Sequence, residues 1–473
     1  MQFNFTKQEL LIAQSISKVS QQLNYPSYFV GGIVRDRLLG RPSKDVDVVC
    51  VGDGIRLAEA VGKDLDIQQA VVVFKRFGTA MIKFEDIELE FVGARKESYS
   101  IDSRKPDVSA GTLEDDQNRR DFTINAMAAS LNADNFGKII DPFNGIGDLE
   151  SKTIKTPLDP DKTFSDDPLR MMRGIRFATQ LGFNIDEITK EGIKRNSERL
   201  KIISAERITQ ELNKIILSDK PSIGFNLLSE TNLLNIFFPE FEALRGVEVR
   251  NNQRHKDNYY HTLKVLDNLC EDSDDLWLRW AAILHDIAKP ATKRFSKDHG
   301  WTFHGHEVVG ARMVPKIFKR FKLPLDHKMK FVEKMVRLHL RPISLTKEDI
   351  TDSAMRRLLF DAGEDLDELM LLCKADITSK NAQKVATIKA NYKIVKQKLL
   401  EVEEKDQIRY WQPPISGDLI METFKIKPSR TVGIIKDAIR EAILDGDIPN
   451  DYDAAYAFML EKAASLGLEI TSN

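Results

Sequence analysis

The stretch that decides the fold runs Tyr28-Phe29-Val30-Gly31-Gly32-Ile33-Val34-Arg35-Asp36 and continues as Lys44-Asp45-Val46-Asp47-Val48-Val49. It predicts a strand, a Gly-Gly turn into a short helix, and a second strand that opens with two carboxylates. Side chains two residues apart on a strand share a face, so we expect Asp45 and Asp47 to project together beside the turn. Such a pair can hold two Mg²⁺ ions across an in-line phosphoryl transfer. The same pattern also fits a strand that begins at a polar sheet edge.

The glycine turn and the helix after it suit a triphosphate. Gly31 and Gly32 have no side chain, so backbone N–H groups can approach phosphates closely. Arg35 lies one helical turn further on, where its guanidinium can bind the negative charge. Short motifs of this kind also occur by chance, so later segments must decide between nucleotidyl transfer and a plain glycine turn.

Composition narrows the class of protein. The chain has 473 residues, of which 42% are hydrophobic and 30% charged, which is ordinary for a globular protein of about three domains. The formal net charge is −2, so any RNA contact must come from local patches. Cys50, Cys270 and Cys373 form no C-x-x-C pair, which indicates reduced thiols. No apolar run approaches the roughly 20 residues of a membrane span, and the N-terminus lacks a signal-peptide pattern. We therefore expect a cytoplasmic protein.

Two patterns of apolar residues follow each other along the chain. Short β-branched runs typical of an α/β fold occur at Tyr28–Val30, Val46–Val51, Val71–Phe74, Thr79–Phe84 and Ile87–Val92. From about Phe164 onward the spacing is helical and strand signals disappear. We predict an α/β head followed by a long all-α body, a multi-domain α+β architecture. The predicted segments are an N-terminal helix at 1–24, the head at 25–150, a helical neck at 151–250, a helical domain at 251–400 and a helical tail at 401–473.

A charged stripe is predicted on the helix that begins near Asp167. Asp167-Pro168 is a favoured helix start, and Asp167, Arg170, Arg173 and Arg176 recur every three residues along one side. Three arginines on one stripe repel each other unless anions lie between them, and a nucleoside triphosphate would supply such charge. A carboxylate acceptor beside a guanidinium donor also matches the pairing edges of cytosine and adenine and mismatches uracil and guanine. The dipeptide alone fits a plain helix cap equally.

Histidine and aspartate recur through the helical region in the order His…His-Asp…His…His…Asp. An apolar segment, Trp277–Ile287, carries a His-Asp pair near its end, where unpaired polar groups would be costly. Imidazole and carboxylate without thiolate suit Mn²⁺, Ni²⁺, Fe or Mg²⁺ better than structural zinc. A lone histidine is usually structural, so the hypothesis depends on the whole set: His261, His285, Asp286, His306, His339 and Asp376.

Other charged positions leave structural and functional roles open. Between Arg312 and Arg341 basic residues far outnumber acidic ones, and charge alone favours a solvated helix face over RNA contact. Glu90, in a predicted strand, fits a third carboxylate or a solvent-facing residue. The polar stretch from Arg95 to Pro106 is expected to be a flexible loop. Arg120 lies in a charged turn before a buried apolar segment.

Five ordered segments within about the first 210 residues resemble the bacterial tRNA CCA-adding enzymes of the class II nucleotidyltransferase family. They are Phe29–Asp47, Glu114–Ala126, Asp141–Leu149, Asp166–Phe177 and Ser204–Ile208. The histidine order resembles the metal-dependent phosphohydrolases of the HD superfamily. The likeness continues less densely to Leu466. The family usually has Glu where this chain has Asp166, a change that keeps the charge and shortens its reach.

The resemblance implies template-independent addition of C, C and A to tRNA 3′ ends from CTP and ATP, with Mg²⁺ held by the catalytic residues Asp45 and Asp47. It assigns nucleotide binding to Gly32, Arg35, Arg120, Asp167, Arg170, Arg173 and Arg176. Among these, Asp167 and Arg170 select the base. The neck is then expected to bind nucleotide and RNA, the tail to bind tRNA, and the basic segment between Arg312 and Arg341 to contact the RNA backbone.

By the same resemblance, the helical domain at 251–400 is an HD-type metal domain. A first metal, Mn, Ni or Fe, would be held by His261, His285, Asp286 and Asp376, with His306 and His339 available for a second. The metal would activate a water for attack on a phosphoester.

Three alternatives stay open. A poly(A) polymerase predicts a strongly basic C-terminal tail, whereas Asp445–Asp453 and Glu461–Asn473 are not basic. Members of the resembled family that add only CC have a shortened loop at 95–106, so the full-length segment here favours the complete CCA activity over a CC-only enzyme, and an A-only enzyme stays an alternative. An HD phosphohydrolase with an RNA-binding head is disfavoured because pure binding needs no carboxylate pair. The sequence predicts no oligomeric state.

Overall fold

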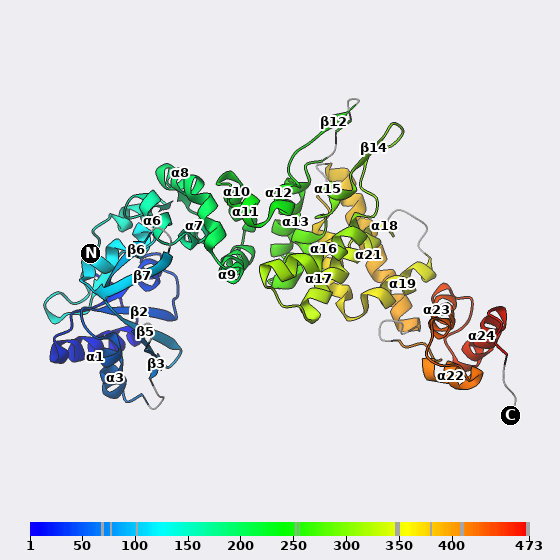
Figure 1. The fold of residues 1–473 in the computed structure, drawn as a ribbon, viewed down its shortest axis with the longest axis horizontal. Helices are drawn as coiled ribbons and strands as arrows, with labels where there is room; N and C mark the ends of the chain where they lie inside the picture. Colours follow the sequence, from blue (N-terminus) through cyan, green and yellow to red (C-terminus); the bar gives the residue numbers. More distant parts are fainter. Residues whose placement is uncertain are drawn as a thin grey trace. The chain divides into compact units, whose positions relative to one another are not determined.

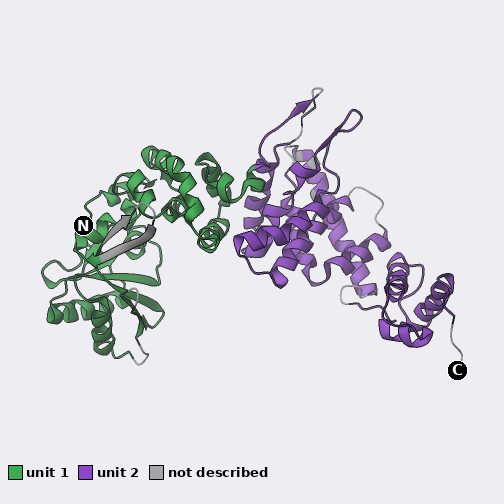
Figure 2. Ribbon diagram, in the orientation of Figure 1, with its two compact units in different colours: residues 1–242 green, residues 243–473 purple. Residues whose placement is uncertain are grey.

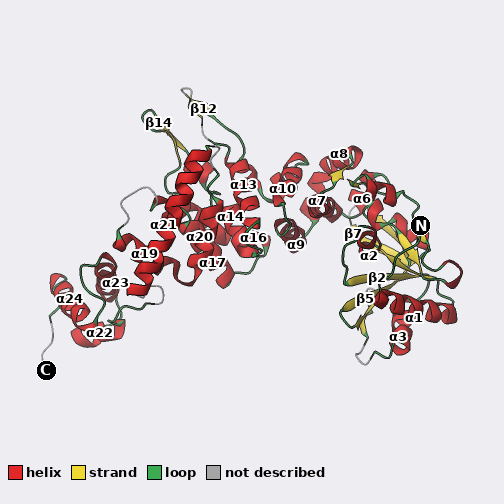
Figure 3. Cartoon of the chain, turned by 180° about the vertical axis from the view of Figure 1, so that it is seen from behind, coloured by secondary structure: helices red, strands yellow, loops and turns green. Residues whose placement is uncertain are grey.

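The computed structural model describes the chain except for residues 68–70, 76–77, 101–102, 251–252, 255, 346–350, 379–380, 407–410 and 470–473. The chain forms two compact units, residues 1–242 and 243–473 (Figure 2). The first unit holds a seven-stranded sheet and the second is largely helical (Figure 3). The predicted fold class, an α/β head followed by a helical body, is confirmed. No described helix has both the length and the apolar character needed to cross a membrane, and the cytoplasmic location stays a prediction.

The sheet of the first unit has the strand order β3-β4-β5-β2-β1-β8-β9 (Figure 1). Its strands are β1 (Ser27–Val30), β2 (Asp45–Cys50), β3 (Val72–Phe74), β4 (Thr79–Phe84), β5 (Ile87–Gly93), β8 (Ala128–Ser130) and β9 (Ile139–Ile140). Helices α1 (Lys7–Leu23) and α3 (Gly54–Asp64) pack against each other, and α3 packs on β4 and β5. The five strands predicted between Tyr28 and Val92 are all present.

Strand β2 lies in the middle of this sheet and is paired on both sides. It runs antiparallel to β1 and parallel to β5. Val46 and Val48 are buried, and so are Leu89 and Phe91 of β5. Because alternate side chains point to opposite faces, burial of these apolar residues sends the intervening carboxylates to the other face.

A set of short helices follows the sheet within the first unit. They include α2 (Gly32–Leu38), α4 (Leu113–Asn118), α5 (Gly145–Glu150), α6 (Pro160–Asp166), α7 (Leu169–Leu181), α8 (Glu187–Asn196), α9 (Ala205–Ile216), α10 (Pro221–Glu230), α11 (Leu233–Phe237) and α12 (Pro239–Glu242). Helix α7 packs on both α9 and α10. Helix α7 begins one residue later than the Asp167-Pro168 start predicts, with Pro168 in the N-cap position, and the Asp167 carboxylate accepts the backbone N–H of Leu169 at 3.1 Å.

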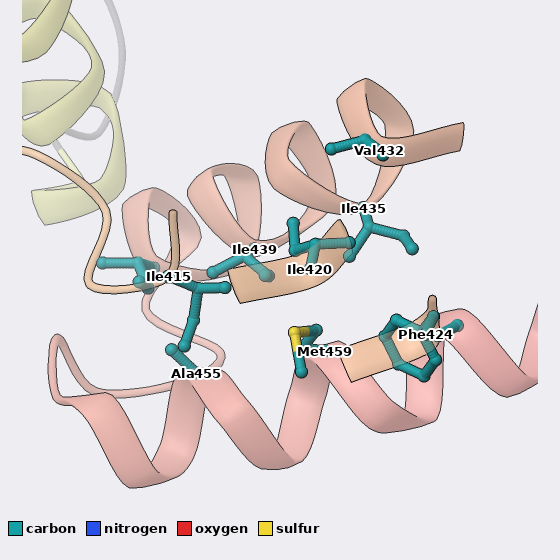
Figure 4. Packing of buried hydrophobic residues seen from close by; sticks show 10 residues of the cluster. Ile415, Ile420, Phe424, Val432, Ile435, Ile439, Ala455 and Met459 are labelled. Atoms are coloured by element: carbon teal, nitrogen blue, oxygen red, sulfur yellow. The ribbon is translucent and has the colours of Figure 1, made fainter. Parts of the chain in front are cut away.

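The second unit contains a helical core and a small tail. The core includes α13 (Asn258–Cys270), α14 (Leu276–Leu284), α15 (Lys289–Thr292), α16 (His306–Phe321), α17 (His327–Leu338), α18 (Arg341–Ser344), α19 (Asp352–Ala362), α20 (Leu366–Ala375) and α21 (Ala382–Asp406). The tail helices are α22 (Gly417–Phe424), α23 (Arg430–Asp445) and α24 (Tyr452–Ser465). Figure 4 shows their apolar core, in which Ile420, Ile439 and Met459 come from the three helices.

Two expectations about local structure are wrong. The stretch from Arg95 to Pro106 was expected to be a loop, but β6 (Arg95–Ser100) and β7 (Ser103–Ala110) form an antiparallel hairpin. Strands also continue beyond Phe164, as β11 (Asn184–Ile185) and the hairpins β12–β13 and β14–β15. The polar residues of the first hairpin resemble a loop in composition, and strands of two or three residues are too short to show an alternating pattern.

Candidate functional site

A cavity of about 660 Å³ in the first unit has one wall made of carboxylates. It receives Asp45 and Asp47 from β2 and Glu88 and Glu90 from β5. The parallel register pairs Asp45 with Glu88 and Asp47 with Glu90, so the four side chains form a ladder on one sheet face. Glu90, which the sequence left undecided, therefore lies beside Asp47 in the cavity.

The carboxylate ladder is an environment that favours a cation or a proton. Burial raises the pKa of Asp47, the Arg120 guanidinium opposes that rise, and the charges of Asp45 and Asp116 add to it. Burial also raises the pKa of Glu90, and the charge of Asp47 contributes. Negative charges held this close repel one another, so bound divalent cations would relieve the repulsion. The donor set is all oxygen, which fits Mg²⁺.

The Gly-Gly turn borders the same cavity. Gly31 has φ +72°, and a Cβ built on it would lie 3.0 Å from Arg120 Nη1 and 3.1 Å from Asp47 Oδ2. A side chain at this position would therefore be strained and would enter the space between these two groups. Gly32 begins helix α2 and also lines the cavity, but a Cβ there meets no atom closer than 3.7 Å.

Five cationic side chains complete the cavity lining: Arg35, Arg120, Arg173, Arg176 and Lys214. All four arginines are held by carboxylates of the chain itself, and Arg35 Nη2 lies 2.9 Å from Asp36 Oδ2. Arg120 Nη2 lies 2.9 Å from Asp116 Oδ2, Arg173 Nε lies 2.7 Å from Asp121 Oδ2, and Arg176 Nε lies 2.6 Å from Glu211 Oε2. The anions predicted between the arginines are thus supplied in part by the protein, so the stripe does not by itself require a triphosphate.

Asp121 is the most strongly perturbed of these partners. Its burial raises the pKa, but Arg173 and a hydrogen bond from Asn125 outweigh burial and bring the pKa to about 2. Asp121 is therefore ionised across the neutral range and fixes Arg173 at the cavity. Asn125 also accepts a hydrogen bond from Arg35 Nη1 at 2.8 Å. Its side-chain amide therefore connects Arg35 to Asp121, which in turn holds Arg173.

The sequence did not identify several residues of the cavity, among them Glu88, Phe177 and Lys214. The Phe177 ring lies under three guanidinium groups, with centroid distances of 5.0 Å to Arg35, 5.5 Å to Arg173 and 4.0 Å to Arg176. Such contacts are favourable because the ring face is electronegative. Phe177 follows the arginine stripe directly, but its apolar side chain gave no signal of a site.

The structure places the predicted base-selecting pair outside the cavity lining. Among the described residues that line it, neither Asp167 nor Arg170 appears. Asp167 Oδ2 lies 3.4 Å from Arg207 Nη2. Arg170 is buried and donates to the carbonyl of Arg119 at 2.7 Å and that of Thr163 at 3.4 Å. Both side chains are engaged with protein groups in this conformation.

A second cluster lies in the second unit and unites all six predicted metal ligands. They are His261 of α13, His285 and Asp286 after α14, His306 of α16, His339 after α17, and Asp376 after α20. The two oxygens of Asp286 face different histidines. Oδ2 lies 3.5 Å from His261 Nε2 and 3.3 Å from His285 Nε2, and Oδ1 lies 3.2 Å from His306 Nε2 and 3.9 Å from His339 Nε2. Asp286 is thus shared by two groups of ligands.

Three of these histidines share a hydrogen-bonding pattern. The Nδ1 atoms of His285, His306 and His339 lie 2.6–2.7 Å from the carbonyl oxygen three residues earlier. Because a carbonyl only accepts, each Nδ1 carries the proton and each Nε2 is left with a lone pair. All three Nε2 atoms are buried and have no hydrogen-bond partner, which is costly unless a metal fills that role. Burial lowers the pKa of His339 to about 4, which keeps the ring neutral as a ligand must be.

Lysines complete the surroundings of this cluster. Lys289 Nζ lies 2.6 Å from Asp286 Oδ2, and Lys256 Nζ lies 2.8 Å from His261 Nδ1. His261 Nε2 lies 2.9 Å from Asp376 Oδ1. The sequence did not single out either lysine, because surface lysines are common and give no local signal.

The basic segment between Arg312 and Arg341 forms much of α16 and α17. Several of its cations have carboxylate partners, including Lys334 with Asp365 at 2.6 Å and Arg341 with Asp361. The segment is therefore partly neutralised, and its assignment to RNA contact stays a prediction.

Three family models match separate parts of the chain. The poly A polymerase head domain matches residues 27–155, the probable RNA- and SrmB-binding site of polymerase A matches 182–244, and the HD domain matches 258–381. The head cavity and the metal cluster thus fall in regions that match different models.

Relatives and solved structures cover more of the chain. A multifunctional CCA protein of Pseudomonas fluorescens (strain Pf-5) is 34% identical over 307 residues, which is 63% of this chain and 71% of that protein. A multifunctional CCA protein of Shewanella frigidimarina is 32% identical over 374 residues, covering 75% and 84%. The structure of a Thermotoga maritima CCA-adding enzyme complexed with tRNA matches with a TM-score of 0.60 and 21% identity, covering 98% of this chain and 96% of that one. The last likeness shows a shared fold.

Proposed function

The chain belongs to the family of bacterial CCA-adding enzymes, and on that premise we propose that it adds C, C and A to the 3′ end of tRNA from CTP and ATP. One observation carries the proposal from the structure: a carboxylate ladder and five cations line the same cavity. Nucleotidyl transfer needs both, because the triphosphate is bound by cations while its metal ions are bound by carboxylates.

In the proposed reaction, the 3′ oxygen of the tRNA bonds to the α-phosphorus of the incoming nucleotide. The bond between that phosphorus and the pyrophosphate oxygen breaks, pyrophosphate leaves, and the hydroxyl proton passes to solvent. Asp45 and Asp47 hold Mg²⁺, which, when bound, lowers the pKa of the attacking hydroxyl and neutralises charge on the phosphates. Arg35, Arg120 and Arg173 bind the triphosphate, and their internal partners keep them oriented before it arrives.

Arg176 and Lys214 bind phosphate or sugar at the edge of the same cavity in this proposal. Gly32 brings the first turn of α2 close to the phosphates, since its backbone has no side chain over it.

We further propose that Asp167 and Arg170 select the base. Both lie at the start of α7, and residues one and two turns later on this helix line the cavity. Base recognition then requires Arg170 to exchange the Arg119 carbonyl for the nucleotide. The neck and the tail are proposed to contact the tRNA.

The transferase proposal is tested with three tRNA transcripts that lack the final A, the final CA, or the whole CCA. Each is incubated with CTP and ATP, together and separately, and the products are resolved to single nucleotides. We expect each transcript to stop at a complete CCA end. Runs of A would favour a poly(A) polymerase, and products that stop at CC or grow only by A would identify a partial enzyme.

The metal cluster supports a second candidate activity, hydrolysis of a phosphoester. Three buried Nε2 atoms without partners favour bound metal, and the shared Asp286 favours two ions, held by the six residues described above. Bound Mn, Ni or Fe would supply an activated water. The water oxygen then bonds to phosphorus, the bond to the leaving oxygen breaks, and the leaving oxygen takes a proton.

Elemental analysis of the purified chain tests this second candidate. We expect transition metal in stoichiometric amount, a lower Tm after chelation, and recovery of both Tm and bis-p-nitrophenyl phosphate hydrolysis when metal is restored. A chain that binds no metal and keeps its Tm with chelator would overturn the proposed site.

A further inference from the structure

Two β-hairpins border the metal cluster of the second unit. The first consists of β12 (Val249–Arg250) and β13 (Gln253–Arg254), and the second of β14 (Arg294–Ser296) and β15 (Gly300–Thr302). Figure 1 shows both extending from the helical body near α13 and α15. Strands β13 and β15 are in contact, so the two hairpins form one surface.

Residues that lie within five positions of these strands in the sequence contact the metal cluster. Lys256, two residues after β13, approaches His261, and Lys289, five residues before β14, approaches Asp286. The backbone carbonyl of Phe303, the residue after β15, accepts the Nδ1 proton of His306 at 2.7 Å. A ligand chain held on the hairpins would therefore reach the cluster without crossing the rest of the unit.

The hairpin surface alternates aromatic rings and cations. Phe295 and Trp301 lie opposite each other in the β14–β15 register, with ring centroids 5.1 Å apart. The Arg250 guanidinium lies 4.8 Å from the Phe295 ring, and Lys293 Nζ lies 4.5 Å from the Trp301 ring. Both rings are half-buried and Arg250 is exposed. Aromatic side chains interleaved with cations bind single-stranded nucleic acid, because bases stack on the rings while the cations contact phosphates.

The charge of this surface also favours binding of nucleic acid. By sequence, the two hairpins and the residues beside them carry the basic residues Arg250, Arg254, Lys293, Arg294 and Lys297 and the acidic residues Glu248 and Asp298. Glu248 pairs with Lys293 at 2.7 Å, and Arg294 and Lys297 are exposed. This excess is local, since the chain as a whole has a net charge of −2. A basic aromatic surface favours RNA over a protein partner.

We propose that the two hairpins bind single-stranded RNA and deliver its terminal phosphoester to the metal cluster. The inference rests on the proposed phosphohydrolase and names its substrate class: the end of an RNA chain, not a free nucleotide. The cluster breaks the P–O bond as described above, and the hairpins contribute only binding.

Binding and hydrolysis are measured separately with the full-length metal-loaded chain. The binding probe is a fluorescent single-stranded hexaribonucleotide, and the hydrolysis probes are the same oligomer with a 2′,3′-cyclic phosphate end and a 2′,3′-cyclic mononucleotide. The variants are Arg250→Ala and Trp301→Leu. Matched controls are Lys396→Ala, an exposed lysine of α21, and Trp277→Leu, whose ring has its own lysine, Lys328, at 5.2 Å.

We expect each hairpin variant to weaken oligomer binding by about tenfold. Arg250→Ala should also reduce the slope of log affinity against log salt concentration by the amount expected for about one lost phosphate contact. Oligomer kcat/KM should fall in parallel, while mononucleotide hydrolysis and metal content stay unchanged. The inference would be overturned if the control variants lost as much RNA binding as the hairpin variants. It would also be overturned if the hairpin variants bound RNA like the wild type. That second result would leave binding of a protein partner, or packing within the chain, as the role of the hairpin surface. A wild type that binds the oligomer but hydrolyses neither probe would reject the phosphohydrolase proposal instead.

Discussion

Asp45 and Asp47 are the residues on which the proposed transfer chemistry depends. Exchanging either for Asn keeps the shape and removes the charge that holds a metal ion, so we expect nucleotide addition to fall by about 10³-fold or more. Glu59→Gln is the matched control, because Glu59 is an exposed carboxylate of α3 that does not line the cavity. Single-nucleotide extension and circular dichroism would be followed together. Full activity in Asp45→Asn or Asp47→Asn would contradict the metal assignment.

Two substitutions of Asp167 can distinguish a role in helix capping from a role in base selection. Asn caps a helix as well as Asp does, so Asp167→Asn should keep the Tm while Asp167→Ala lowers it slightly. Both variants should misincorporate UTP and GTP more often, because the carboxylate that matches C and A is lost. Incorporation of each nucleotide alone would be measured. If Asp167→Asn keeps wild-type discrimination, Asp167 is only a cap.

Asp121 predicts a pH dependence of stability. Its folded pKa of about 2 lies below the ordinary value of 3.8, so its ion pair with Arg173 stabilises the fold above pH 4 and is lost as the pH falls toward 2. Asp121→Asn should therefore lower the free energy of unfolding by roughly 2 kcal/mol at pH 7. The difference from wild type should shrink below pH 4. Urea unfolding at pH 7, 5, 4 and 3 would measure it, and a pH-independent difference would contradict the ion-pair account.

Sequence analysis found the residues whose signal is local. The Asp45–Asp47 spacing and the order of the histidines are visible in short windows, and the structure brings both groups together. It could not find Glu211 as the partner of Arg176 or Asp121 as the partner of Arg173, because 35 and 52 residues separate these pairs and only tertiary packing joins them. Phe177 was missed because an apolar side chain gives no signal of a site.

The turn between β1 and α2 leaves little room for a side chain at its first glycine. Gly31→Ala places a methyl group at a positive φ and close to Asp47 and Arg120, so we expect a loss of stability of about 1 kcal/mol and a larger loss of activity. Gly32→Ala is the control, since it begins a helix and its Cβ has room. Thermal unfolding and nucleotide addition would be measured for both. Equal behaviour of the two variants would mean that the turn conformation does not matter for the cavity.

Elements with strong periodicity were predictable, and short ones were not. The sequences of strands β2 and β5 contain runs of apolar and β-branched residues, and the predicted ends of both strands lie within one residue of the observed ends. The β6–β7 hairpin was not, because its polar residues do not alternate with apolar ones. Its two strands form because their backbones pair with each other. Such pairing cannot be read from the composition of either strand.

The whole molecule carries its two candidate sites in different units. Head residues between Gly31 and Lys214 line the cavity, and the metal cluster lies between His261 and Asp376. We expect the double variant His285→Ala/Asp286→Ala to lose bound metal and any phosphodiesterase activity while CCA addition is unchanged. Its second unit should unfold at lower temperature, because metal binding stabilises the folded state. A folded double variant that no longer adds CCA would show that the two sites depend on each other.

The change from a strand-rich head to a helical body was visible in the apolar spacing. The first unit ends at Glu242, eight residues before the predicted boundary at 250. The prediction missed this point because helices on both sides of the boundary give no change of pattern. Which helices pack together is decided by tertiary contacts, and these leave no mark on the periodicity of a single helix.

The division after Glu242 has a consequence for how this chain can change over generations. Every residue proposed for transfer is encoded before that point, and every proposed ligand of the metal cluster is encoded after it. A lineage could therefore alter or lose the metal cluster without change to the transfer cavity, as long as it keeps the tail at 401–473 that is proposed to contact tRNA. Selection can then act on the proposed phosphoester hydrolysis and on CCA addition as two separate traits of one gene.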